Sequence, residues 1–368
     1  MSPAATASRF SVWYSAWSWV VPVTAMAWLA GAWGTAPETW LAMIAGAALL
    51  GAVIAAVHHA EVVAHRVGEP FGTLVLAVAI TVIEVALILS VMLAGGPDKA
   101  ALARDTIFAA VMIITTGVVG ICVLVGGLRH HEQRFQLDGA NAALAAMVAL
   151  AGLSLVMPTF TTSSPVGTFT NSQLVFAAVS SLVLWLAFVF VQTVRHRDYF
   201  LPPTHAADEN RHAEPPSTGL AWLSFVLLLV SLVAVVGLAK LLSPVVEAAV
   251  SAAGAPKAVI GIVIAMVVLL PETWAAVRAA RANRLQTSLN LALGSALASI
   301  GLTIPAVVVA AVWLELPLVL GLEPKDIVML VMAFMVSAIT LGTGRTNVMQ
   351  GAVHLVLFAA FLFLALVP

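Results

Sequence analysis

Two glutamates lie near the middle of long apolar segments of the chain. Glu84 is the only ionisable residue in LAVAITVIEVALILSVML, from Leu76 to Leu93, and Glu272 interrupts GIVIAMVVLLPETWAAV, from Gly261 to Val277. A charged residue at mid-membrane costs about 2.5 kcal/mol or more on insertion scales, so such residues usually face a bundle interior or a watery cavity and mark ion pathways. The pattern therefore predicts that both carboxylates bind cations or protons. The alternative is that each stays protonated and only hydrogen-bonds a neighbouring helix.

Small hydroxyl residues accompany both glutamates. Thr81 shares a helix face with Glu84 and precedes it by about one turn, and the apolar segment that follows each glutamate contains further Ser and Thr residues. Ser and Thr in membrane helices often bond only their own backbone, so their grouping is more informative than any one of them. The predicted cation- and proton-binding residues are Thr81, Glu84, Thr116, Glu272, Ser295 and Ser299, with Glu84 and Glu272 as the metal ligands.

Carboxylate and hydroxyl oxygens favour hard cations such as Ca²⁺ or Na⁺ over metals that prefer imidazole or thiolate. Two carboxylates balance the charge of one Ca²⁺, and their mutual repulsion lets protons compete with the metal. We therefore expect an exchange in which protonation releases the cation on one side of the membrane and deprotonation allows uptake on the other. No cofactor is expected beyond the transported Ca²⁺, Na⁺ or K⁺ and protons.

The composition is that of an all-α polytopic membrane protein. Of 368 residues, 62% are hydrophobic and only 9% are charged, which is far from the composition of soluble domains. The single cysteine, Cys122, excludes an intrachain disulfide. A net charge of −1, without a basic run interleaved with aromatics, argues against nucleic-acid binding. The expected environment is the lipid bilayer.

About 20 apolar residues cross a bilayer as a helix, and this length predicts about eleven transmembrane helices. The spans are expected near 14–34, 39–57, 71–93, 106–127, 139–157, 172–193, 220–242, 258–277, 287–312, 327–342 and 347–367. With the N-terminus in the cytoplasm, only five of the 16 Lys and Arg residues fall outside, as the positive-inside rule favours. A rival interpretation of the first span is a cleavable signal peptide, because Arg9 precedes an apolar stretch and Ala25-Met26-Ala27 is similar to a cleavage site.

The spans divide into two halves of five. We expect a peripheral transmembrane helix in 1–38, a five-helix repeat in 39–194, a cytoplasmic linker in 195–219 and a second five-helix repeat in 220–368. An odd number of crossings makes the second half enter the membrane from the opposite side, as in the inverted repeats of secondary transporters. Glu84 and Glu272 occupy the second span of their halves.

The segments GEPFGTLVLAVAITVIE from Gly68 and PETWAAVRAARANRLQTSLNLALGSALASIGLTIP from Pro271 resemble the two α-repeats of the cation/Ca²⁺ exchanger superfamily. The resemblance is closest to the bacterial ChaA-type Ca²⁺(Na⁺)/proton antiporters and spans nearly the whole chain. Gly68-Glu69 leads into the Glu84 helix, and Gly294-Ser295 follows Glu272, as in that family.

The resemblance implies alternating access in the bacterial inner membrane, with the proton gradient driving Ca²⁺ or Na⁺ out of the cell. The chain departs from many relatives, which carry Asn at the positions of Thr81 and Leu269 and an amide near Thr116 and Ser299. These departures leave open an antiporter of Na⁺ or K⁺ that transports little Ca²⁺.

Two further alternatives remain at this point. An intramembrane peptidase could use Ser295 as nucleophile and His354 as base, which requires the pair to lie within hydrogen-bond reach. A passive channel could be lined by the same polar residues. Proton coupling distinguishes the antiporter from the channel.

Overall fold

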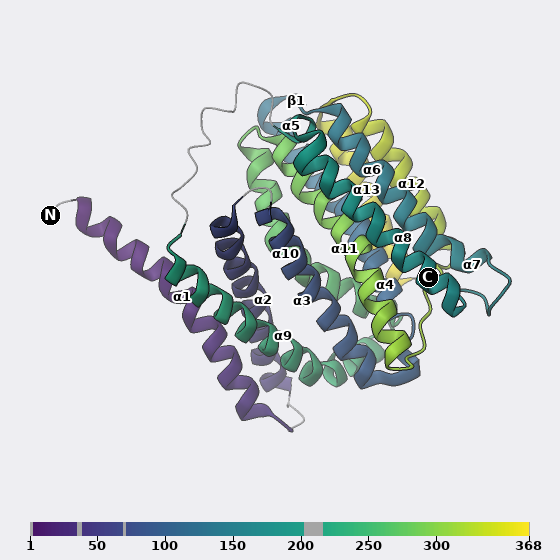
Figure 1. Ribbon diagram of the computed structural model, residues 1–368, viewed down its shortest axis with the longest axis horizontal. Coiled ribbons are helices and arrows are strands. Elements are labelled where there is room, and N and C mark those ends of the chain that lie inside the picture. The colour runs from purple at the N-terminus through teal and green to yellow at the C-terminus, as the bar shows by residue number, and fades with distance from the viewer. Residues whose placement is uncertain (1–2, 35–38, 69–70, 202–215, 368) are drawn as a thin grey trace. The chain divides into compact units, whose positions relative to one another are not determined.

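The computed structural model describes residues 3–34, 39–68, 71–201 and 216–367, and these residues are almost entirely helical (Figure 1). The α-helices are α1 (Pro3–Ala32), α2 (Thr39–Val67), α3 (Phe71–Gly95), α4 (Leu102–Met112), α5 (Val119–His130), α6 (Leu137–Ala151), α7 (Met157–Phe160), α8 (Asn171–Phe190), α9 (Thr218–Ala252), α10 (Ala258–Arg281), α11 (Leu285–Trp313), α12 (Pro324–Leu341) and α13 (Val348–Leu366). Two short strands, β1 (Gln133–Arg134) and β2 (Arg345–Thr346), form an antiparallel pair.

Three of the described membrane spans contain a π-helical turn, which continues into α-helix in two of them and ends the helix in the third. The π-helical segments are η2 (Ile113–Val118), η3 (Gly152–Val156) and η4 (Val191–Arg195), and two short 3-10 segments are η1 (Gly96–Lys99) and η5 (Arg197–Phe200). Each π-helical turn shifts the hydrogen-bond register, and such turns occur frequently at functional sites. α4, η2 and α5 together form one continuous span from Leu102 to His130.

The expected all-α membrane architecture is confirmed. The described residues contain ten helices long and apolar enough to cross a membrane, together with a shorter apolar stretch, Ala16–Ala32, inside α1. Some helices continue beyond the predicted spans, because polar residues end an apolar run without ending a helix. α2 was expected to end near residue 57 but continues to Val67, where Gly68 adopts φ +77° and its N–H bonds the Ala64 carbonyl. Gly at this left-handed position is a common helix stop.

The helices form two compact units. The smaller unit comprises Met1–Ala94 and Ala213–Ala249, and therefore α1, α2, most of α3 and most of α9. The larger unit comprises Gly95–His212 and Val250–Pro368 and contains the remaining helices. Each unit thus combines segments from both halves of the sequence.

In the smaller unit, polar contacts join helices that are distant in sequence. The ring Nε2 of buried His59 on α2 lies 2.8 Å from the Ser18 carbonyl on α1. Ser90 on α3 donates to the Val236 carbonyl on α9 at 3.2 Å. In an apolar environment, such bonds satisfy groups that lipid cannot, and they contribute to helix association.

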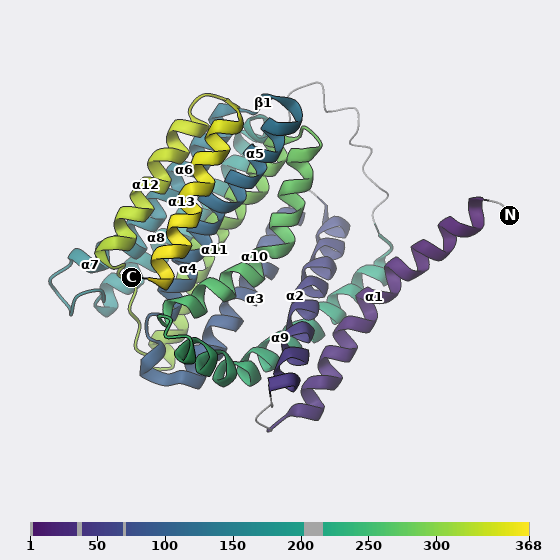
Figure 2. The same cartoon turned by 180° about the vertical axis from the view of Figure 1, so that it is seen from behind.

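In the larger unit, the third span of each half packs against the fifth span of the other half. α11 packs against α8, and α13 packs against α5 (Figure 1 and Figure 2). Glycines permit both close approaches. A Cβ added at Gly301 would lie 2.5 Å from Trp185 Cβ, and one added at Gly351 would lie 2.5 Å from the Leu124 nitrogen.

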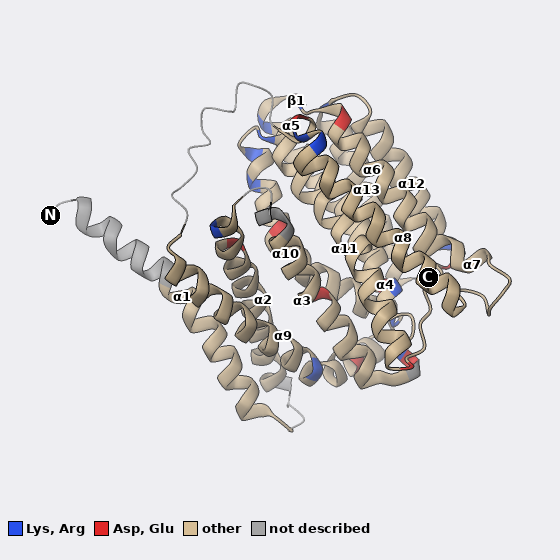
Figure 3. Ribbon diagram, viewed as in Figure 1, with Lys and Arg blue, Asp and Glu red and all other residues tan. Residues whose placement is uncertain are grey.

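The loops of the larger unit also pair a segment of one half with a segment of the other half. β1, in the loop after the third span of the first half, pairs with β2, in the loop after the fourth span of the second half. In the reciprocal arrangement, Leu320 and Gly321, after the third span of the second half, both donate to the Gly167 carbonyl, after the fourth span of the first half. Lys and Arg residues are concentrated at the end of the larger unit near β1 (Figure 3).

Candidate functional site

Glu272 and Ser295, two of the residues predicted from the sequence, are in direct contact. The Ser295 hydroxyl on α11 donates to Glu272 Oε2 on α10 at 2.9 Å. α10 and α11 pack against each other, and Glu272 is half-buried. Pro271 directly precedes Glu272 inside α10 and cannot donate a backbone hydrogen bond. The carboxylate therefore lies on a helix whose backbone bonding is locally incomplete.

The π-helical segment η2 contacts both of these helices. Thr116 lies in η2, is completely buried, and its hydroxyl donates to the Met112 carbonyl. The neighbouring Thr115 hydroxyl donates to the Val111 carbonyl at 2.7 Å. Ser299 lies on α11 one turn beyond Ser295 and is 3% exposed. Thr116 and Ser299 therefore lie on elements that surround Glu272. The hydroxyl hydrogen of Thr116 is bonded within its own span.

Glu84 and Thr81 lie on α3 in the smaller unit. Glu84 is 2% exposed, as the sequence led us to expect for a carboxylate that faces protein. Thr81 is also buried, and its hydroxyl donates to the Ala77 carbonyl at 2.9 Å. Its hydrogen therefore goes to the α3 backbone. Glu69, which precedes α3 in the sequence, lies outside the described residues.

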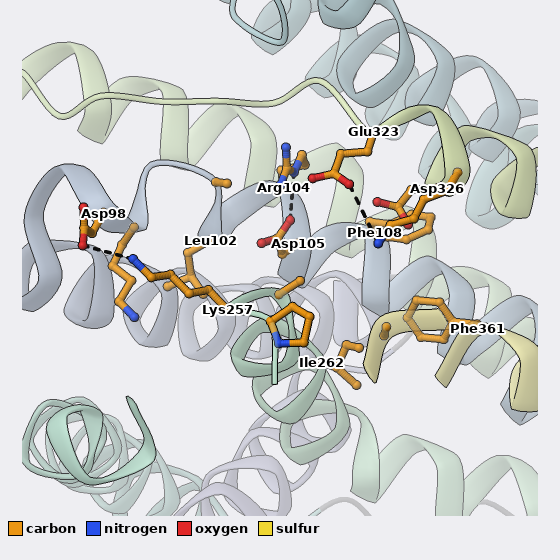
Figure 4. Close-up of a pocket in the computed structure, with 16 residues that line it drawn as sticks. Asp98, Leu102, Arg104, Asp105, Phe108, Lys257, Ile262, Glu323, Asp326 and Phe361 are labelled. Atoms are coloured by element: carbon orange, nitrogen blue, oxygen red, sulfur yellow. Dashed lines mark hydrogen bonds and ion pairs between the residues drawn. The ribbon is translucent and has the colours of Figure 1, made fainter. Parts of the chain in front are cut away.

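Sequence reasoning did not anticipate a charged cavity in the larger unit (Figure 4). It measures about 360 Å³ and lies among the first turns of α4, α10 and α12. Arg104 Nε lies 2.8 Å from Asp105 Oδ1, and a second Arg104 nitrogen donates to the Gly321 carbonyl at 3.0 Å. Lys257 and Asp98 form an exposed ion pair at 3.0 Å. The only signal in the sequence was the recurrence of charged residues just before or inside these helix starts.

The proposed nucleophile and base of a peptidase have other partners. Ser295 donates to Glu272, whereas His354 bonds the Thr115 carbonyl and the Thr340 hydroxyl. Among the residues that the structure describes, there is no cluster of three or more His, Cys, Asp and Glu side chains able to hold a metal ion. A cation bound here would therefore depend on one or two carboxylates together with hydroxyl and carbonyl oxygens, a ligand set that suits hard cations.

An all-helical membrane bundle with carboxylates buried on its helices is characteristic of ion-transport proteins. A sequence model of the family described as "Sodium/calcium exchanger protein" matches residues 38–194 and 223–367. The chain belongs to this family. It is therefore a multi-pass membrane transporter and not an enzyme, and the peptidase interpretation is wrong.

Individual relatives agree with this assignment. The protein y4hA of Sinorhizobium fredii is 51% identical over 356 residues, which cover 96% of each chain. The sodium-potassium/proton antiporter ChaA of Escherichia coli is 34% identical, with 85% of each chain covered. The solved structure of native YfkE, a Ca²⁺/H⁺ antiporter protein, shares the fold with a TM-score of 0.73 at 16% identity, covering 95% of this chain and 100% of that one. The resemblance to the cation/Ca²⁺ exchangers and to ChaA is confirmed.

Proposed function

We propose that this transporter exports Ca²⁺ in exchange for protons across the bacterial inner membrane by alternating access. Glu84 and Glu272 bind the cation and the protons in turn. The observation that carries the proposal is the Ser295–Glu272 hydrogen bond between two membrane helices, because it orients a carboxylate at a position where an unneutralised charge is costly. A bound cation or a proton supplies the neutralising charge.

The exchange follows from competition for the same oxygens. With both glutamates ionised, the site carries two negative charges, which match one Ca²⁺. Protons arriving from the side of higher proton concentration neutralise the carboxylates, and the cation leaves. Once the transporter exposes the site to the other side, the protons dissociate and a new cation binds. Hydroxyl and carbonyl oxygens from Thr81, Thr116, Ser295 and Ser299 complete the ligand set.

We further propose that residues 39–194 and 220–368 are inverted repeats joined by a cytoplasmic linker in 195–219, after a peripheral helix in 1–38. Two observations support this division. The family model matches two segments, 38–194 and 223–367. In addition, the loop after the third span of each half bonds the loop after the fourth span of the other half. The basic end of the larger unit near β1 supports a cytoplasmic N-terminus, because cytoplasmic loops retain positive charge (Figure 3).

A second candidate function is antiport of Na⁺ or K⁺ with little Ca²⁺ transport. It is favoured by the 34% identity to the E. coli protein, which is named a sodium-potassium/proton antiporter. It also agrees with the family resemblance, in which many exchangers carry an amide where this chain has Leu269, and another near Ala298, where this chain offers only Ser299.

The test uses everted membrane vesicles with an established proton gradient, monitored by an acridine dye. CaCl₂, NaCl or KCl is added separately to vesicles that contain the wild type or the double variant Glu84→Gln/Glu272→Gln. We expect CaCl₂ to collapse the gradient with the wild type only. If NaCl or KCl collapses the gradient and CaCl₂ does not, the second candidate function replaces the first. If none of the three cations collapses the gradient more in wild-type vesicles than in double-variant vesicles, proton-coupled antiport is excluded.

We expect Ser295→Ala to weaken cation binding without abolishing transport. The substitution removes a hydrogen bond to a carboxylate, and loss of such a bond raises the half-saturating cation concentration roughly tenfold. The measurement is the cation dependence of the dye response. Ser231→Ala is the control, because Ser231 is also a serine within a membrane helix but donates to the Leu227 carbonyl of its own helix. An equal effect of both substitutions would contradict a role for Ser295 at the site.

A further inference from the structure

His354 on α13 is completely buried, and both nitrogens of its ring have partners. Nδ1 lies 2.7 Å from the Thr115 carbonyl oxygen, and Nε2 lies 3.0 Å from the Thr340 hydroxyl on α12. A carbonyl oxygen can only accept a hydrogen bond, so Nδ1 must carry a proton. In the neutral ring, Nε2 then accepts from Thr340. The contacts therefore define both the orientation and the tautomer of this side chain.

The Thr115 carbonyl accepts a hydrogen bond from outside its own helix. In a regular α-helix it would accept from the N–H group four residues later, that of Val119. Here the Val119 N–H bonds the Ile114 carbonyl, because η2 has the longer π-helical register. A carbonyl without a donor inside a membrane protein is costly. His354 Nδ1–H donates to the Thr115 carbonyl, inside η2, from a helix of the other half of the chain.

Two glycines allow α13 to approach η2 and α5 closely enough for this bond. A Cβ added at Gly120 would lie 3.0 Å from His354 Cβ, and one added at Gly117 would lie 3.3 Å from the Phe358 ring. η2 contacts α12 and α13, and it also contacts α10 and α11, which carry Glu272 and Ser295. A side chain that stabilises η2 can therefore act on the surroundings of Glu272 without touching the cation.

We propose that His354 is a positioning residue of the cation site. Through the Thr115 carbonyl it holds η2 in its π-helical conformation, which places Thr116 and the backbone oxygens of this segment against α10 and α11. This role rests on the proposed function, because it assigns to His354 the geometry of the site where cation and proton compete. His354 thus contributes to cation affinity although it is buried and is not a cation ligand.

Three substitutions at His354 separate its two hydrogen bonds. The amide nitrogen of Asn can take the place of Nδ1 and donate to the Thr115 carbonyl. That of Gln takes the place of Nε2 and can only donate, so the Thr340 hydroxyl would accept from it. Leu replaces neither nitrogen. We measure Ca²⁺ and Na⁺ binding to the purified protein by calorimetry and the cation dependence of antiport in vesicles. For the wild type's preferred cation, we expect His354→Gln and His354→Leu to raise the half-saturating concentration about tenfold, the effect of one lost hydrogen bond. His354→Asn should stay close to the wild type, and the maximal rate should change little in all three.

Thr340→Val is the matched control, since it removes only the partner of Nε2 and should leave cation affinity close to the wild-type value. Equal affinities for His354→Leu and wild type, or an Asn variant no better than the Gln variant, would overturn the role of His354. If His354→Leu does not fold, the comparison of Asn with Gln decides. If the wild type binds the cation in calorimetry but collapses no proton gradient, the proposed antiport fails while the affinities still test His354.

Discussion

Replacement of Glu272 by Gln is expected to stop proton-coupled cation transport. Gln is nearly isosteric and can still accept the hydrogen bond from Ser295, so the contact between α10 and α11 is retained while the charge is lost. Removing one partner of a buried charge interaction costs about 2–5 kcal/mol. The half-saturating cation concentration should therefore rise at least about 30-fold. Glu272→Asp keeps the charge but shortens the side chain, and should retain measurable transport.

The matched control for this variant is Glu132→Gln in the same unit. Glu132 is exposed and forms long ion pairs with Arg134 and Arg345, at 3.6 and 3.7 Å. Surface pairs of this kind contribute about 0–1 kcal/mol, so transport should remain at the wild-type level. Dye measurements in everted vesicles, with protein amounts matched by immunoblot, provide the comparison. Wild-type transport by Glu272→Gln would show that Glu272 is not a ligand.

Replacement of Glu84 by Gln should reduce transport as strongly as Glu272→Gln does. It should not impair membrane insertion. Glu84 is 2% exposed on an otherwise apolar helix, α3. The neutral amide is less costly than a carboxylate at this depth, so the variant should accumulate in the membrane at least as well as the wild type. It removes one of the two negative charges that balance Ca²⁺, and Ca²⁺ flux should fall at least about 30-fold.

Radiolabelled Ca²⁺ uptake into vesicles, together with the amount of protein in the membrane, measures both quantities. Val82→Leu is the control on the same helix, because Val82 is 45% exposed and points away from the packed interior of the smaller unit. It should change neither quantity. Normal Ca²⁺ flux in Glu84→Gln would limit the binding site to Glu272 and exclude the two-carboxylate mechanism. Poor accumulation of the Gln variant would show that the Glu84 carboxylate has mainly a structural role.

Much of the architecture was predictable because it depends on local composition. Apolar runs near 20 residues long correctly located the membrane helices, since lipid forces the backbone to satisfy its hydrogen bonds within each segment. Family motifs around Glu84 and Glu272 correctly indicated the exchanger family. The helix ends were less predictable. α2 continues past His58 and His59 and ends only at Gly68, because backbone conformation, and not hydropathy, stops a helix.

The candidate site, like the fold, was predictable only in part. The sequence by itself determined that glutamates and hydroxyl residues would lie on long apolar helices, because apolar runs of this length form membrane helices. Only the tertiary structure decided which groups meet. Ser295 reaches Glu272, whereas Thr81 and Thr116 bond their own helices. Thr115 in η2 bonds His354 on α13, which lies 239 residues away in the chain. Such pairings arise from packing between helices, and no local pattern encodes them.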